Sequence, residues 1–138
     1  MDFRECLKKR IAKEVSEDKE LIESLFKTSQ NKLFSEEKLK LDEVSASSKI
    51  SLLYDSLREL LEALAIQNRF KIYNHECYTS FLKEVMNNGE LAEEFDDIRK
   101  IRNSINYYGK EVSLTEAKEV LERMIVLRKR ILNLFRQV

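Results

Sequence analysis

Apolar residues recur at intervals of three and four along most of the chain, which is the spacing of one face of an α-helix. The clearest run spans positions 50–64 and consists of Ile50, Leu53, Tyr54, Leu57, Leu60, Leu61 and Leu64. Further helices are predicted at about residues 2–15, 17–42, 75–86, 90–108 and 114–135. No alternation typical of a β-strand extends beyond a few residues. We therefore expect an all-α antiparallel helical bundle of about five to six helices.

Polar and glycine residues mark several predicted helix ends. Asn74 is expected to cap the helix that follows it, and Ser113 with Glu116 three residues later matches a capping box. Gly89 and Gly109 are expected to end the helices before them in the left-handed conformation. Short connections of this kind are typical of a single bundle.

Composition agrees with one helical domain over residues 1–138. The chain has no proline and two glycines, as suits long helices. Charged residues make up 36% and balance to zero net charge, which disfavours a globally basic nucleic-acid binder but not a local basic patch. No apolar run approaches the roughly 20 residues of a membrane-spanning helix, so no membrane association is expected.

The cysteine and histidine content bears on metals and on the compartment. Cys6 and Cys77 lie far apart and lack a paired metal spacing, so we interpret them as free thiols in a reducing cytoplasm. His75 is the only histidine, and no metal site or other cofactor is predicted. His75 stands at a predicted helix start. Two roles are compatible with this position: a structural or capping role, and a role in a functional site.

Arg102 interrupts the apolar face of the helix predicted at about 90–108. In helical projection it falls between Phe95 and Ile98. A buried guanidinium is costly unless it is paired and hydrogen-bonded. Either Arg102 has a committed partner within the bundle, or this face opens onto a binding site or a second subunit.

A set of polar side chains surrounds Arg102 on the same helix. Asn106 lies four residues after Arg102, Asn103 lies three residues before Asn106 and four before Tyr107, and Arg128 interrupts the apolar face of the last predicted helix in the same way. A guanidinium suits phosphate or carboxylate, asparagine can donate and accept, and tyrosine can hydrogen-bond or stack on a base. We predict these five residues as phosphate or ligand contacts, with Arg128 in a small basic patch.

The stretch Arg102-Asn103-Ser104-Ile105-Asn106-Tyr107 resembles the arginine, asparagine, three residues, histidine signature of HEPN domains. The resemblance extends upstream: positions 47–64 are similar to the second long HEPN helix, and positions 70–76 to the turn before the third. It covers about residues 17–136.

The resemblance implies a bundle that forms a two-fold homodimer. Active HEPN members are metal-independent RNA endonucleases, whose arginine and histidine line a cleft between subunits. Others bind nucleotides or partners, and some are paired with a minimal nucleotidyltransferase as a toxin–antitoxin couple. Arg102 and Asn103 carry over from the signature.

The histidine of the signature does not carry over, because Tyr107 stands in its place. An acid or base for RNA cleavage should titrate near neutral pH, and tyrosine does not. We therefore expect a catalytically degenerate module that binds nucleotide or RNA, or regulates a partner. The alternatives are an RNA endonuclease with the altered catalytic set Arg102, Asn103 and Tyr107, and a structural helical adaptor.

Overall fold

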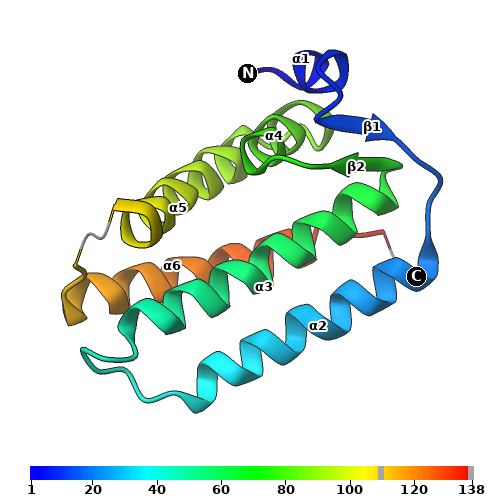
Figure 1. Cartoon of the computed structure of the whole chain (residues 1–138). Helices are drawn as coiled ribbons and strands as arrows, with labels where there is room; N and C mark the ends of the chain where they lie inside the picture. Colours follow the sequence, from blue (N-terminus) through cyan, green and yellow to red (C-terminus); the bar gives the residue numbers. More distant parts are fainter. Residues whose placement is uncertain (109–110, 137–138) are drawn as a thin grey trace.

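The computed structural model describes residues 1–108 and 111–136, and at 106–108 the backbone alone. Four long helices form a bundle: α2 (Lys19–Lys38), α3 (Ala46–Gln67), α5 (Gly89–Tyr108) and α6 (Leu114–Leu132). Helix α3 lies between α2 on one side and α5 and α6 on the other (Figure 1). Helices α2 and α3 run antiparallel, as do α5 and α6. The described part of the chain is thus an all-α helical bundle, as the apolar pattern predicted.

Helix α3 supplies the centre of the core. All seven apolar positions predicted between 50 and 64 are buried, with at most 1% of any of these residues exposed. They pack against the apolar faces of α5 and α6, among them Phe95, Met124 and Leu127. Burial on this scale is the main stabilising contribution in a helical bundle.

The N-terminal segment differs from the single helix predicted at residues 2–15. Helix α1 (Phe3–Lys8) ends after six residues, and Arg10 adopts a positive φ of 59°. Strand β1 (Ala12–Glu14) follows and pairs antiparallel with β2 (Phe70–Ile72), a segment without a predicted strand. Three-residue strands carry too little alternation to be recognised in a sequence, and here they form through their pairing with each other.

The α4 region also departs from the prediction. Helix α4 (His75–Ser80) begins at the Asn74 cap, whose Oδ1 accepts a hydrogen bond from the Glu76 N–H at 2.7 Å, as predicted. It continues as a π-helix, η1 (Phe81–Val85). The expected left-handed stop at Gly89 is wrong: Asn87 takes the positive φ of 53°, and Gly89 is the first residue of α5. Asparagine tolerates this conformation because its short side chain can hydrogen-bond locally.

Helix α6 starts as its sequence predicts. The Ser113 hydroxyl accepts a hydrogen bond from the Glu116 N–H at 3.1 Å and contacts the Glu116 carboxylate at 3.2 Å. The expected stop at Gly109 lies outside the described residues.

The prediction of two free thiols is wrong. Cys6 of α1 and Cys77 of α4 form a disulfide, with 71 residues of sequence separation and 6.2 Å between their Cα atoms. The antiparallel pairing of β1 with β2 places α1 beside α4, so the sequence distance between the cysteines says nothing about their distance in space. This finding removes the thiol-based argument for a reducing compartment. Among the described residues, no helix is both long and apolar enough to cross a bilayer.

Candidate functional site

Arg102 is half-buried on the face of α5 that meets α3. Its guanidinium lies over the ring of Tyr54, with Cζ 4.9 Å from the ring centroid. Tyr54 is fully buried on α3 and stacks on Phe95 at 6.1 Å between ring centroids. A cation over an aromatic face is attracted by the ring quadrupole, which explains how an arginine is tolerated within an apolar stripe.

Tyr54 connects Arg102 to the only histidine of the chain. The Tyr54 hydroxyl lies 2.9 Å from His75 Nδ1, and the two rings are 5.6 Å apart. Burial raises the pKa of Tyr54 to about 12, although Arg102, Arg99 and Arg58 act to lower it. The hydroxyl therefore stays protonated at neutral pH and holds the imidazole by a hydrogen bond whose direction depends on the histidine tautomer.

His75 is held in its neutral form. Burial lowers its pKa, and the positive charges of Arg58, Arg102 and Arg99 lower it further, opposed by Asp55. Neutral imidazole can accept a proton or a hydrogen bond at one ring nitrogen and donate at the other. We call Tyr54, Arg58, His75, Arg99 and Arg102 the arginine–histidine cluster.

Two arginines of the cluster are oriented by acidic neighbours on their own helices. Arg99 donates to Asp96 from Nε at 3.1 Å and from Nη2 at 2.8 Å. Arg58 lies 3.3 Å from Glu62 one turn further along α3. Burial alone would raise the pKa of Asp96, but hydrogen bonds from Arg99 and Lys100 outweigh it and keep that pKa low. The carboxylate is therefore ionised and holds Arg99 in place.

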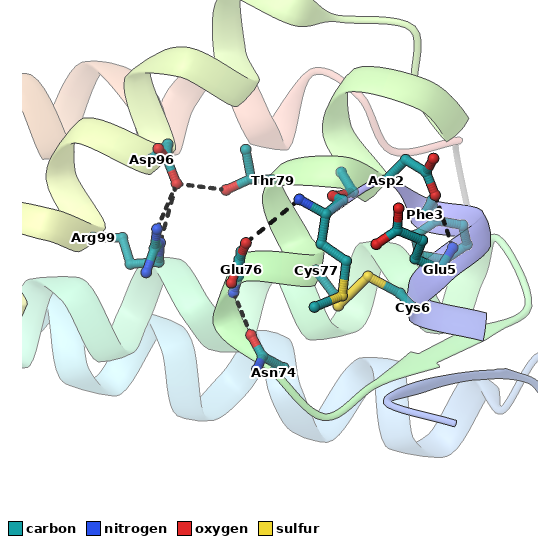
Figure 2. A network of polar contacts seen from close by, with 12 residues as sticks. Asp2, Phe3, Glu5, Cys6, Asn74, Glu76, Cys77, Thr79, Asp96 and Arg99 are labelled. Atoms are coloured by element: carbon teal, nitrogen blue, oxygen red, sulfur yellow. Dashed lines mark hydrogen bonds and ion pairs between the residues drawn. A yellow bond between two sulfur atoms is a disulfide. The ribbon is translucent and has the colours of Figure 1, made fainter. Parts of the chain in front are cut away.

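Asp96 also joins the cluster to α4. The Thr79 hydroxyl lies 3.2 Å from the same Asp96 oxygen that accepts from Arg99, and Figure 2 shows the three side chains converging. A displacement of α4 relative to α5 would therefore move His75 and separate Thr79 from Asp96, the carboxylate that holds Arg99.

The other predicted site residues take separate places. Asn103 is half-buried on α5, next to Arg102. Asn106 and Tyr107 belong to α5, but their side chains lie outside what the structure describes. Their assignment as ligand contacts remains a prediction.

Arg128 is not brought to the cluster. From α6 its Nε donates to the Ser56 hydroxyl at 3.0 Å and its Nη2 to the Ser29 hydroxyl at 3.3 Å. Ser56 lies two residues after Tyr54 on α3, so the two side chains point to different sides of that helix. The structure thus places Arg128 between α2, α3 and α6, whereas the predicted basic patch beside Arg102 would need it near α5.

Sequence reasoning did not include Tyr54, Arg58 or Arg99 in the site. Tyr54 was indistinguishable from the core residues around it because it shares their spacing. Two arginines could have indicated these positions in the sequence. Arg58 lies one turn after Tyr54, and Arg99 lies three residues before Arg102. A pocket of about 220 Å³ between α5 and α6 does not suit phosphate, because its lining combines apolar residues with Glu116 and Glu119. Arg123 also lines this pocket, but its guanidinium is paired with Glu94.

Comparison of the chain with models of known protein families, with curated proteins and with solved structures finds no match.

Proposed function

We propose that this chain is a HEPN-like module that binds a nucleotide or RNA, with a phosphate group held at the arginine–histidine cluster. The observation that carries the proposal is the contact chain from Arg102 through Tyr54 to His75. It joins the arginine of the HEPN-like motif to the only imidazole of the sequence. Arg58 and Arg99 add positive charge on the same side of α3 and α5.

The cluster has the chemistry that phosphate recognition requires. Guanidinium groups offer paired donors that match phosphate oxygens, and a neutral imidazole adds a donor or an acceptor. Arg58 and Arg99 each keep one acidic partner, so the excess positive charge is modest. A zero net charge also gives little long-range attraction to a polyanion. Both points favour a nucleotide or an RNA end over a long duplex.

Calorimetric titration tests this proposal with inorganic phosphate, adenosine monophosphate and a short single-stranded RNA as probes. Arg102→Ala should weaken binding of each probe that binds by about tenfold or more, because a hydrogen bond to a charged group contributes about 1.5–3 kcal/mol. Arg4→Ala removes an exposed arginine of α1 and serves as the matched control. Equal affinities for the wild type and a folded Arg102→Ala protein would remove the cluster as the binding site.

The proposal includes a homodimer and a minimal nucleotidyltransferase partner, as the HEPN resemblance implies. Light scattering at micromolar concentration tests the dimer, and a monomer there would contradict it. Co-expression with a nucleotidyltransferase encoded beside this chain, followed by co-purification, tests the partner.

A second candidate function is metal-independent RNA cleavage. It is favoured by His75, since the Tyr54 ring that lies under Arg102 also contacts this imidazole, although the helical motif holds Tyr107 in place of histidine. The lowered pKa of His75 leaves the imidazole unprotonated at neutral pH, which is the form a general base requires, and also makes it a weaker base. Incubation of RNA with the protein in the presence of a chelator tests this candidate. Cleavage that persists in both Arg102→Ala and His75→Gln would exclude the cluster as its source.

A further inference from the structure

Residues 1–14, which we call the N-terminal strap, place α1 against α4 and pair β1 with β2. The Met1 amino group lies 3.5 Å from the Glu76 carboxylate, and the Phe3 N–H donates to the Glu84 carboxylate at 2.9 Å. The strap also carries the disulfide between Cys6 and Cys77, which Figure 2 shows close to Glu76. One covalent bond and a few polar contacts therefore attach the strap to the helix that begins with His75.

The strap has little structure that could persist without these attachments. Helix α1 has six residues, well below the length at which an isolated helix is stable, and β1 has three. The apolar anchor is Phe3, whose ring packs edge-on to Phe70 at 5.0 Å and against Phe81 at 6.0 Å. Ala12 is also buried and β1 is paired with β2, so the disulfide matters most for the attachment of residues 1–8 to α4.

The disulfide ends close to the arginine–histidine cluster. Cys77 lies two residues after His75 on α4, and α4 itself has only six residues before it becomes a π-helix. Thr79 lies one turn after His75 on the same helix. Its hydroxyl contacts Asp96, and Asp96 orients Arg99. The position of α4 therefore sets both the contact of His75 with Tyr54 and the contact of Thr79 with Asp96.

We propose that the Cys6–Cys77 disulfide is a redox switch for the arginine–histidine cluster. In the oxidised protein the strap holds α4 so that His75 meets Tyr54. In the reduced protein the strap separates from α4, and His75 loses its fixed position and part of its burial. The proposal rests on the proposed function for the identity of the ligand, but the coupling of the disulfide to His75 is independent of any ligand.

The reduction is a thiol–disulfide exchange with a dithiol as the reductant. One thiolate of the dithiol attacks a protein sulfur, the S–S bond breaks, and the other protein sulfur leaves as a thiolate that takes up a proton. The second thiolate of the dithiol then displaces the remaining protein sulfur. The dithiol is oxidised by two electrons to its cyclic disulfide, and Cys6 and Cys77 are reduced to thiols. Both cysteines are fully buried, so the strap must open for the attack.

Ring-proton NMR of His75 measures the coupling directly, because it is the only histidine. Spectra are recorded over a pH series on the full chain, oxidised and after dithiothreitol in native buffer, with alkylation and mass determination to count the thiols. Reduction should shift the His75 resonances and raise its pKa towards the ordinary value. Tryptic cleavage at Lys8, Lys9 or Arg10, which are exposed at the end of α1, should quicken by about tenfold or more.

Cys6→Ser with Cys77→Ser provides the matched control. It should reproduce the reduced spectrum and cleavage rate and be insensitive to dithiothreitol. Identical His75 pKa values in the two redox states would overturn the proposal. Resistance to dithiothreitol without denaturant would also overturn it, as would loss of the helical circular dichroism signal on reduction, since the disulfide would then be a structural cross-link.

Binding of inorganic phosphate to both redox states separates this inference from the proposed function. Weaker binding after reduction supports both. A redox-dependent His75 pKa without phosphate binding in either state would support the switch and contradict phosphate recognition by the cluster.

Discussion

The polar contacts of Arg128 predict a specific energetic coupling within the bundle. The Ser56 hydroxyl accepts from Arg128 Nε at 3.0 Å and donates to the Ser29 carbonyl at 2.7 Å, and Ser29 and Ser56 are both fully buried. Burial lowers the pKa of Arg128, and the charge of Glu37 opposes this, so the guanidinium stays protonated at neutral pH. We infer that Arg128 locks α6 to α2 and α3.

Ser56→Ala removes one acceptor of a half-buried guanidinium. Losing a hydrogen bond to a charged group costs about 1.5–3 kcal/mol, and losing the neutral bond to Ser29 costs about 1 kcal/mol. The free energy of unfolding should therefore fall by about 2.5–4 kcal/mol. Arg128→Met should cost less, because it removes the partly desolvated charge together with its requirement for partners.

A double-mutant cycle in urea, followed by circular dichroism, measures the coupling. In the Arg128→Met background, Ser56→Ala should cost less than in the wild type by about 1.5–3 kcal/mol, the contribution of the Arg128–Ser56 bond. Additive effects within about 0.5 kcal/mol would refute the interpretation of Arg128 as a lock. Phosphate affinity gives a second check: a folded Arg128→Met protein should bind phosphate as the wild type does. A loss as large as that of Arg102→Ala would favour the phosphate-binding role predicted from the sequence.

Three further predictions concern the cluster and the strap. The pKa of His75 is lower in the folded protein than in the unfolded chain, so the unfolded chain takes up a proton first as the pH falls. The free energy of unfolding should therefore fall as the pH falls through 6.5 and level off below the pKa of the folded protein. Urea midpoints between pH 7 and about 5.5 measure this slope, and His75→Gln should flatten it. Tyr54→Phe keeps the ring contacts but removes the hydroxyl bound to His75, and should lower the free energy of unfolding by about 1 kcal/mol in the same assay. An unchanged value would show that this hydrogen bond contributes nothing. Replacing both cysteines by serine should cost about 4 kcal/mol, given the 71-residue separation, with the bundle still folded. A loss below about 1 kcal/mol would show that the unfolded chain gains little freedom.

The bundle could be predicted because local signals and burial agree. Spacing of three and four placed the buried face of α3 correctly, and the Asn74 and Ser113 caps mark real helix starts. The N-terminal helix was predicted too long because β1 forms only by pairing with β2, some sixty residues later. Likewise, the left-handed residue before α5 is Asn87, whereas the prediction considered only glycine for that conformation.

The sequence by itself determined the all-α class, the core face of α3 and the unusual position of Arg102 in an apolar stripe. Those properties follow from helical periodicity, which each segment carries locally. Only the tertiary structure decided what Arg102 contacts, because Tyr54 reaches it from α3 and in turn contacts His75 at the start of α4. It also decided that Cys6 and Cys77 are bonded and that Arg128 contacts Ser29 and Ser56. Such contacts depend on how helices pack across long sequence separations, which the periodicity of any one helix does not specify.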